Sequence, residues 1–548
     1  MIKIRPVAAP SLLRFIKLEQ VCTRPCHHAV APNEYTDVPK YPPIVDMSRR
    51  AKKKRLKTAW HDKITKLPTV EQKLMELNLP KYYGYWSGHL IDVCPKLLGL
   101  NFIQYATRTH VVNGLPEEYY SDVKNEAERL TTAVTDKVEH LIHLNYNCPL
   151  SRRSFGPGRA SERHSTQNFL LGLHRLMAST VDSTVQHIKE SVVDMQPRVE
   201  AFWILGGLPP DEMLRKTRKN YEPSKELEND LIDRTMQGVS TPRLGVRVTD
   251  GLPEVVSRDD PLATSAFVPD NKLDPRAFGF RFQHKPATTV TGFWPGEKKE
   301  HSQLWLHSRE FITKFVEEYG EHNTDVALHH MMIISSFTQA LAHAAYLGFG
   351  PVTELTYPLV QQSAITDGQR WNFSVYQLNT CTLHSDLATN NPHNNILWLG
   401  EEQVLFENGV KGLNAEVLTA LISMYLKKGI ERDNPTPHLG SYKHLADHPA
   451  SEEYREMFQS HLHDLFSGRG RHFMKPEMYL WEKIYKKDFN TRFFEARRRF
   501  FENHYKQKDP GQRRLDEYSP IYIPKAKRKD RRVKYKPMLD SEELYKYH

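Results

Sequence analysis

Positive charge is concentrated at the two ends of this chain of 548 residues, and the long middle is acidic. Residues 1–57 carry 13 Lys or Arg against 4 Asp or Glu, and residues 471–548 carry 22 against 12. Because the formal net charge of the whole chain is only +10, residues 58–470 have a net charge of −9. Basic arms on an acidic body are typical of a protein whose arms lie along a polyanion and whose body packs on other proteins. The alternative is that both arms are solvated tails.

The first 18 residues have the pattern of a mitochondrial transit peptide. They contain four basic residues, no acidic residue, and apolar residues that an amphipathic helix would gather on one side. A secretory signal needs about seven uninterrupted apolar residues, and Arg14 and Lys17 break the run. We therefore predict import into mitochondria, with a transit peptide and linker over residues 1–40. Pro6 and Pro10 weaken the helix, so a disordered basic tail is the alternative.

A second basic cluster follows at residues 49–57 and would lie near the mature N-terminus. We predict that Lys52, Lys53, Lys54 and Arg55 bind RNA. Taken alone, the same cluster is also typical of a nuclear localisation signal. A nuclear RNA-binding or RNA-processing factor is therefore the alternative function.

Composition indicates a globular body in a reducing compartment. A hydrophobic content of 39% is enough for a sizeable core, and five cysteines form no even disulfide framework. The group Cys22, Cys26, His27 and His28 has zinc-binding residue types, but its spacing matches no common site. We expect no metal and no cofactor.

No segment has the pattern of a membrane span. The most apolar stretch, Val326 to Leu347, contains three histidines and a glutamine, which are costly in hydrocarbon. It predicts a buried core helix, capped at Asn323 or Thr324 and ended by Gly348.

The pattern of the whole chain predicts a mixed α/β (α+β) fold, in which helices pack on an antiparallel sheet. Five regions are expected: a transit peptide and linker (1–40), a helical region (41–205), a Pro/Gly-rich region of strands and loops draped over a surface (206–300), an α/β core (301–430), and a basic helical extension with a tail (431–548). Helices are expected at 121–144, 161–195, 302–319, 326–347 and 415–428, the last with Asn414 as its cap and Gly429 as its stop.

Residues 359–383 change from a helical period to a period of two. Asp367-Gly368 lies between an apolar run and the alternating segment that begins at Trp371, which is a strong hairpin signal. Ile396 to Trp398 predicts a further short strand. Asp367, Cys381 and His384 are close enough in sequence to suggest a nucleophile site. Turn chemistry, strand burial and the loop explain these three residues better, and the chain lacks the common catalytic and nucleotide-binding motifs, so we expect no enzyme.

Three segments of the sequence resemble segments of a known protein family. The string AITDGQRWNFSVYQLNTCTLHSDLATNNPHNNILW, the later string LFENGVKGLNAEVLTALISMYL, and KYPPIVDMS near the N-terminus occur in one order. Together they resemble a family of metazoan mitochondrial ribosomal proteins, first numbered thirty in the small subunit and now assigned to the large subunit as number sixty-five. The resemblance is strong over 350–428, weak between Ile64 and Gly350, and ends near Lys428.

What the resemblance implies is a non-catalytic structural subunit of the mitochondrial large ribosomal subunit. Such a protein lies on ribosomal RNA (rRNA) among other mitochondrial ribosomal proteins. It pairs with a homologous large-subunit protein, number thirty-seven, as a heterodimer.

The C-terminal extension lies beyond the resemblance. Residues 476–508 predict a basic helix about 50 Å long, with an aromatic stripe expected to pack on protein and with Arg497, Arg498 and Arg499 directed toward phosphate. The tail beyond Pro510 has almost no core-forming residues and is expected to be disordered alone. It is expected to bind rRNA through eight cations: Lys525, Lys527, Arg528, Lys529, Arg531, Arg532, Lys534 and Lys536.

Overall fold

The fold was analysed in a computed structural model of the chain. It describes residues 46, 51, 55, 58–59, 62–64, 66–67, 73, 87–91, 99–147, 159–181, 185–208, 232–271, 273, 275–283, 289–293, 299–351, 354–384, 391–406, 412–430 and 432. The chain divides into two compact units, Met1–Arg55 and Leu56–His548. Of the first unit, Asp46, Ala51 and Arg55 are described; the fold and the contacts below are those of the second unit. The transit peptide, the group of Cys22 to His28 and the extension after Arg432 lie outside the described residues.

The larger of two sheets is mixed. Its strands run in the order β2-β11-β10-β9-β8-β6-β3, and β12 pairs with β10 at one end. β11 pairs with β2 and β8 with β9 in parallel, and the other pairs are antiparallel. The strands are β2 (Thr109–Asn113), β3 (Val192–Met195), β6 (Leu244–Val248), β8 (His301–Ser308), β9 (Leu359–Thr366), β10 (Arg370–Leu378), β11 (Asn395–Leu399) and β12 (Gln403–Val404). The α+β expectation is confirmed, with parallel pairs in addition to the antiparallel ones.

A smaller sheet has the order β4-β5-β1-β7. It consists of β1 (Ser87–Ile91), β4 (Val199–Leu208), β5 (Ile232–Ser240) and β7 (Arg281–Gln283). β1 is parallel to β5, and the pairs β4–β5 and β1–β7 are antiparallel.

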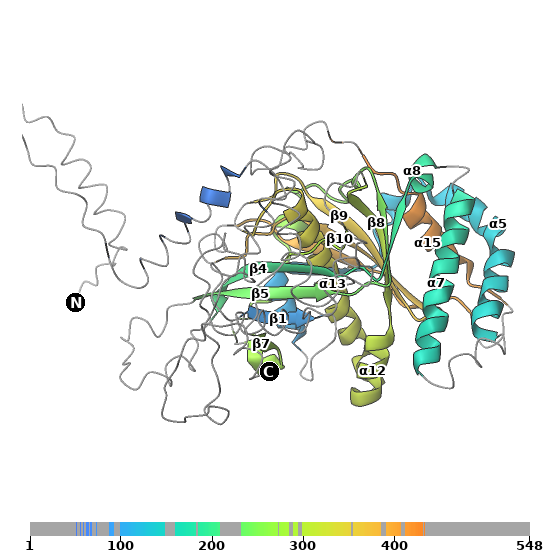
Figure 1. Ribbon diagram of the computed structural model, residues 1–548, viewed down its shortest axis with the longest axis horizontal. Coiled ribbons are helices and arrows are strands. Elements are labelled where there is room, and N and C mark those ends of the chain that lie inside the picture. The colour runs from blue at the N-terminus through green and yellow to red at the C-terminus, as the bar shows by residue number, and fades with distance from the viewer. Residues whose placement is uncertain are drawn as a thin grey trace, which may run out of the picture. The chain divides into compact units, whose positions relative to one another are not determined.

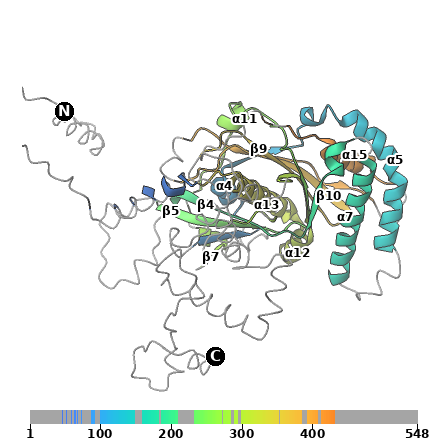
Figure 2. The same ribbon diagram turned by 45° about the horizontal axis from the view of Figure 1, so that its top comes forward.

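Helices separate and cover the two sheets. The long helix α13 lies between them, against β4 and β5 on one side and β9 and β10 on the other (Figures 1 and 2). α5, α7 and α15 form an outer layer on the far face of the larger sheet. The helices are α4 (Leu100–Thr107), α5 (Lys124–Ile142), α7 (Arg159–Val181), α8 (Gln186–Lys189), α11 (Pro261–Thr264), α12 (Glu310–Tyr319), α13 (Thr324–Tyr346) and α15 (Ala415–Leu426), with short helical turns η1 (Glu118–Tyr120), η2 (His143–Asn147), η3 (Pro275–Phe278) and η4 (Glu321–Asn323).

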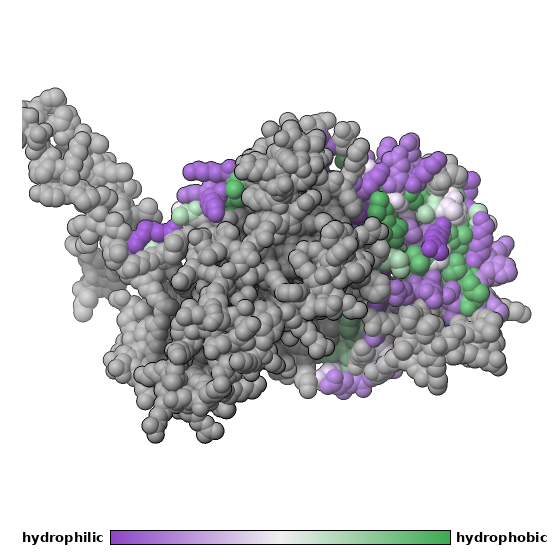
Figure 3. Space-filling view, viewed as in Figure 1, coloured by the Kyte–Doolittle hydropathy of each residue, from purple (hydrophilic) through white to green (hydrophobic). Residues whose placement is uncertain are grey.

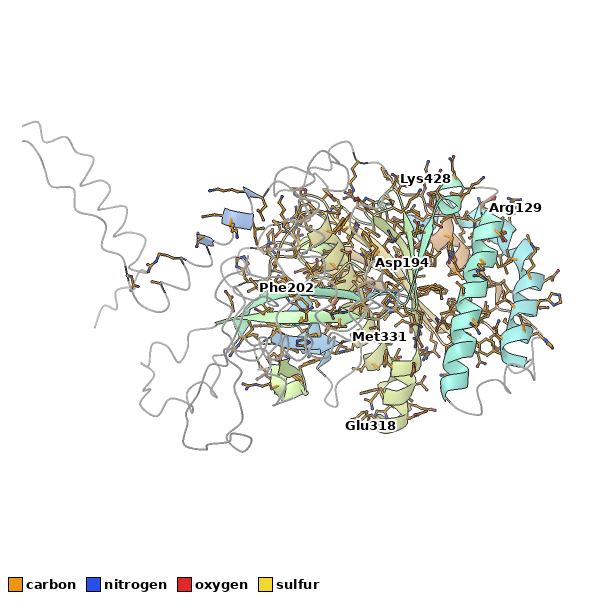
Figure 4. All side chains as sticks on the ribbon, viewed as in Figure 1. Arg129, Asp194, Phe202, Glu318, Met331 and Lys428 are labelled. Atoms are coloured by element: carbon orange, nitrogen blue, oxygen red, sulfur yellow. The ribbon has the colours of Figure 1, made fainter. Side chains whose placement is uncertain are left out.

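The layers enclose two hydrophobic cores. The first lies around α13 and includes Phe202, Trp203 and Phe337. The second lies between the larger sheet and the outer helices and includes Phe169, Trp371 and Tyr425. Figure 4 shows Phe202 and Met331 inside the body, while Arg129 on α5 and Glu318 at the end of α12 lie at its outside. The predicted core helix is confirmed: almost all of α13 is buried, and Gly348 follows it at φ +94°. The predicted cap is wrong, because neither Asn323 nor Thr324 makes a side-chain capping hydrogen bond to the helix.

The predicted hairpin is also confirmed. β9 and β10 pair from Leu359–Leu378 to Thr366–Trp371. Asp367 Oδ1 accepts hydrogen bonds from the backbone N–H groups of Gln369 (2.9 Å) and Arg370 (2.7 Å). Gly368 has φ +97°, the left-handed region that the turn requires. The helix at 415–426 and the strand at 395–399 are confirmed as well, and Asn414 Oδ1 caps α15 by accepting from Glu416 N at 2.9 Å.

Gly368 and Gly114 allow a matched test of this turn. Both have φ near +95°, but a Cβ at Gly368 would lie 1.8 Å from Tyr146 Oη, whereas a Cβ at Gly114 would meet nothing within 4 Å. We expect Gly114→Ala to lower the free energy of unfolding by about 1–2 kcal/mol for the left-handed backbone. Gly368→Ala should cost about 1–3 kcal/mol more, because Tyr146 must leave its hydrogen bond to Asp367 O. Urea unfolding of the two variants measures the difference, and equal losses would contradict the steric argument.

Four expectations were wrong in detail. The helix expected at 161–195 ends at Val181, and residues 192–195 form strand β3. The helix expected at 302–319 begins only at Glu310, because residues 301–308 form the buried strand β8. Ser121 caps no helix, since α5 begins at Lys124 without a side-chain cap. β5 and β6 are interior strands of the two sheets and are not draped over a surface.

Residues 41–205 were expected to be a helical region, but they also contain strands β1 to β3 and the start of β4. Gly429 does not end α15, which stops at Leu426. A larger residue at position 429 would clash with the backbone of Asp250, because a Cβ there would lie 2.5 Å from Asp250 O.

Two buried histidines are expected to make the stability depend on pH. Burial lowers the pKa of His174, which lies against Tyr425, to about 4, and the pKa of His307 in β8 to about 3. Below the ordinary histidine pKa of about 6.5 the unfolded state therefore binds more protons than the folded state, so the free energy of unfolding decreases as the pH falls. Between pH 7.5 and pH 5 we expect a loss of about 2 kcal/mol for each histidine. Burial also lowers the pKa values of His301 and His343, so urea unfolding at the two pH values measures the sum over these residues. His174→Gln should reduce the measured loss by about 2 kcal/mol.

Candidate functional site

The loop that carries the resemblance is held by a buried polar network. Asn391 Nδ2 donates to Thr380 Oγ1 (2.6 Å) and to the carbonyl oxygen of Thr382 (3.2 Å). Thr380 Oγ1 and Thr382 Oγ1 both donate to Glu354 Oε2, the first at 3.1 Å. The other carboxylate oxygen of Glu354 accepts from Arg258 NH2 at 2.9 Å. The atoms named here all have partners within the fold, as buried polar groups usually do. Arg258 Nε is an exception, since it is buried without a hydrogen-bond partner among the described residues.

The same network joins segments far apart in the chain. Asn395 Oδ1 accepts from the backbone N–H groups of Asn379 (2.8 Å) and Thr380 (3.0 Å), and Asn395 Nδ2 donates to Thr107 O (2.8 Å). Arg108, at φ +49°, donates to Asn394 Oδ1 at 2.9 Å and to Asn391 O at 2.5 Å. These Asn and Thr residues between Thr380 and Asn395 therefore hold this loop in its conformation.

Two of the three residues considered for a nucleophile site, Asp367 and Cys381, are placed where they do not suit that role, and the third, His384, is buried. Asp367 lies in the hairpin turn and is occupied by the backbone. Cys381 is fully buried, its thiol donates to Gly350 O at 3.3 Å, and burial raises the pKa of the thiol well above its usual range. A buried thiol with a raised pKa is a poor nucleophile.

Two glutamines that the sequence analysis missed cap a helix. Gln303 Nε2 donates to Met424 O and Lys427 O, both at 2.8 Å, and Gln362 Nε2 donates to Met424 O at 3.1 Å. These carbonyls at the end of α15 have no partner within the helix. The available signal was a polar residue in a buried apolar strand, such as Gln362 in LVQQSAIT.

The body pairs its buried cations internally. Arg198 is paired with Glu200, Arg243 with Glu310, Arg247 with Asp194 and Arg309 with Glu402. Lys427 Nζ donates to Tyr119 O at 2.5 Å and to Asp122 Oδ1 at 3.0 Å. These cations are therefore not available to a phosphate backbone.

Of the predicted RNA-binding residues, one lies in the described part. Arg55 is exposed and helical. The remaining fourteen, Lys52–Lys54, Arg497–Arg499 and the eight cations of residues 525–536, lie outside the described residues, so their arrangement stays a prediction.

One cavity in the described part is too small for a substrate. A cavity lined by residues such as Phe202, Leu341 and Cys381 has a volume of about 10 Å³, which is room for about one water molecule. No group of three or more His, Cys, Asp or Glu in the described residues is placed to hold a metal ion. Among the same residues, no helix is long and apolar enough to cross a membrane.

Comparison with known proteins gives the family. The family model described as "Mitochondrial 28S ribosomal protein S30 (PDCD9)" matches residues 8–429, most of the chain. The chain belongs to this family. The match ends one residue after Lys428, where the resemblance was predicted to end, and it also covers the stretch from Ile64 to Gly350, where the resemblance was weak.

Similar proteins include three that are named large ribosomal subunit protein mL37. The mouse protein is 24% identical over 322 residues, which is 58% of this chain and 65% of that protein. The chicken protein is 23% identical over 350 residues (60% and 71%), and the bovine protein is 25% identical over 358 residues (64% and 71%). The chain thus spans about two thirds of the length of these relatives. As a member of the family it is a mitochondrial ribosomal protein, and the nuclear alternative is set aside.

Proposed function

We propose that this chain is a structural component of the mitochondrial large ribosomal subunit, the member numbered sixty-five, and that it holds rRNA with its basic ends. The family description names the small subunit, whereas the relatives carry large-subunit names. The relatives and the motif resemblance favour the large subunit.

One observation carries the proposal: charge is separated between the ends and the body. Residues 1–57 and 471–548 hold an excess of cations, while the rest of the chain is acidic. The structure supports this division, because the buried arginines of the body are paired internally. Exposed acidic residues such as Glu128, Glu318 and Glu401 repel phosphate. Figure 3 shows hydrophilic residues interspersed with hydrophobic ones over the outer helices, a mixture that is compatible with packing on other proteins.

The proposed protein partner is the homologous large-subunit protein thirty-seven. Identities of 23–25% with proteins of that name support a common fold, and the proposal is that the two pair as a heterodimer beside other ribosomal proteins. Residues 1–40 are proposed to act as the transit peptide and its linker.

Sedimentation of the tagged full chain tests the proposal. Mitochondria are lysed in detergent and run on a gradient with and without ribonuclease. We expect the chain to migrate with the large subunit and to leave that fraction after RNA digestion. Migration with the small subunit, or as a free species that ribonuclease does not change, would reject the proposal.

A further inference from the structure

The outer edge of β3 ends the larger sheet without a neighbouring strand among the described residues. β3 pairs with β6 on one side only. The N–H of Gln196 donates to Arg243 O at 2.9 Å, toward β6. Because a peptide group is planar, the C=O of Met195 then points away from β6. Orientation alternates along a strand, so Val193 and Met195 both present their N–H and C=O groups at the open edge.

The side chains at this edge are also incompletely covered. Val193 and Met195 are half-buried and pack partly against the core beneath α5, α7 and α15. Gln196 Nε2 donates to Gln167 Oε1 of α7 at 2.8 Å, and Leu171, one turn further along α7, is half-buried as well. A further strand at this edge would need apolar residues at alternate positions on the side that faces α7.

We propose that Ile521–Ile523 of the same chain adds to β3 as this further strand. The sequence there is Pro520-Ile521-Tyr522-Ile523-Pro524. Placed opposite Met195 and Val193, Ile521 and Ile523 direct their N–H and C=O groups toward β3. Residues directly opposite each other share a face, so both isoleucine side chains fall on the side of Val193, Met195 and α7.

The two prolines fit the same arrangement. Pro520, Tyr522 and Pro524 take the alternate positions, whose backbone groups point away from β3. Proline has no N–H to donate and is tolerated where that position faces solvent. Pro520 and Pro524 therefore cost no hydrogen bond to β3, and they prevent another strand from adding outside. A strand of three residues between prolines also matches β3, which has four residues.

The chain itself favours an intramolecular strand over one from another protein. Between Arg432, the last described residue, and Pro520 lie 87 residues. Because the segment is tethered to the body by the same chain, its effective concentration at β3 is high. The added strand would place Lys525 and the basic run after it directly at the edge of the body. That this basic run then binds rRNA rests on the proposed function, whereas the strand pairing does not.

Amide hydrogen exchange on the full chain tests the pairing. Val193 and Met195 amides should exchange at least tenfold more slowly in the wild type than in Ile523→Pro, which removes an N–H that faces β3. Tyr522→Pro is the matched control: it adds the same residue type one position away, where the N–H faces outward, and should keep the protection. Equal exchange in all three proteins would overturn the proposal. Protection that increases with protein concentration would assign the strand to a second copy and would also overturn it.

A cross-link inside assembled ribosomes provides a second measurement that does not depend on the stability of the free chain. Met195→Cys combined with Ile521→Cys, and Val193→Cys combined with Ile523→Cys, should each form a disulfide, since opposite residues in a sheet lie within disulfide range. Met195→Cys combined with Tyr522→Cys should not, because its side chain lies on the other face. Absence of a cross-link at both isoleucine positions would overturn the proposal even if the chain binds rRNA.

Discussion

Replacing the eight cations of residues 525–536 by glutamine is expected to weaken rRNA binding by several orders of magnitude at low salt. Each cation that neutralises a phosphate releases a condensed counterion, so the slope of log affinity against log salt concentration should become shallower by about 0.7 for each phosphate that is no longer neutralised. Binding of the full chain to mitochondrial large-subunit rRNA, measured over a range of salt concentrations, gives both quantities.

The control removes cations from the acidic body. Lys124, Arg129, Lys137 and Arg175 lie exposed on α5 and α7, and their replacement by glutamine should leave the slope unchanged. A tail variant that keeps the affinity and slope of the wild type would exclude the tail from RNA binding. Equal effects of the two variants would show that binding reflects total charge only.

Arg247→Met is expected to lower the free energy of unfolding by about 3–5 kcal/mol, the usual cost of breaking a buried ion pair. Arg247 is 1% exposed. It donates from Nε to Asp194 Oδ2 (2.5 Å), from NH2 to Asp194 Oδ1 (3.1 Å) and from NH1 to Lys299 O, and its guanidinium lies 4.4 Å from the ring centre of Phe293. Methionine fills similar volume but leaves the carboxylate and the carbonyl without this donor. Urea unfolding of the full chain measures the loss.

Arg129→Met is the matched control. Arg129 forms an ion pair with Glu126 one turn before it on α5, and its side chain is 66% exposed. Water replaces such an ion pair readily, so we expect no measurable change in stability. Similar losses in the two variants would show that burial of Arg247 is not what makes its pair important.

Local patterns predicted the hairpin and α13 because their signals are contained in a few consecutive residues. Asp367-Gly368 specifies the turn, and the apolar stretch of α13 is long enough to exclude a strand. β8 was mistaken for the start of a helix because it is buried on both faces. Leu304, Trp305 and Leu306 are consecutive apolar residues, so the period of two that marks a half-buried strand is missing.

The polar network could not be predicted from local pattern. Asn395 and Thr107 are 288 residues apart, and no spacing rule relates them. The resemblance drew attention to the correct loop, but only the structure shows that its Asn and Thr residues bind backbone groups. The basic ends were found from composition alone, since an excess of charge needs no partner within the fold to be visible.

The parallel pairing of β2 with β11 has a consequence for how the body is made. Thr109 lies opposite Asn395. β2 therefore cannot pair until β11, almost 300 residues later in the chain, has been synthesised. Contacts of such long sequence separation slow folding, because a large loop must close before they form. Until then β10 has an open edge, and apolar strands are exposed to aggregation. A newly made chain should therefore depend on chaperones until its last family residues have emerged, and truncations before Leu399 should yield insoluble protein and no smaller folded body.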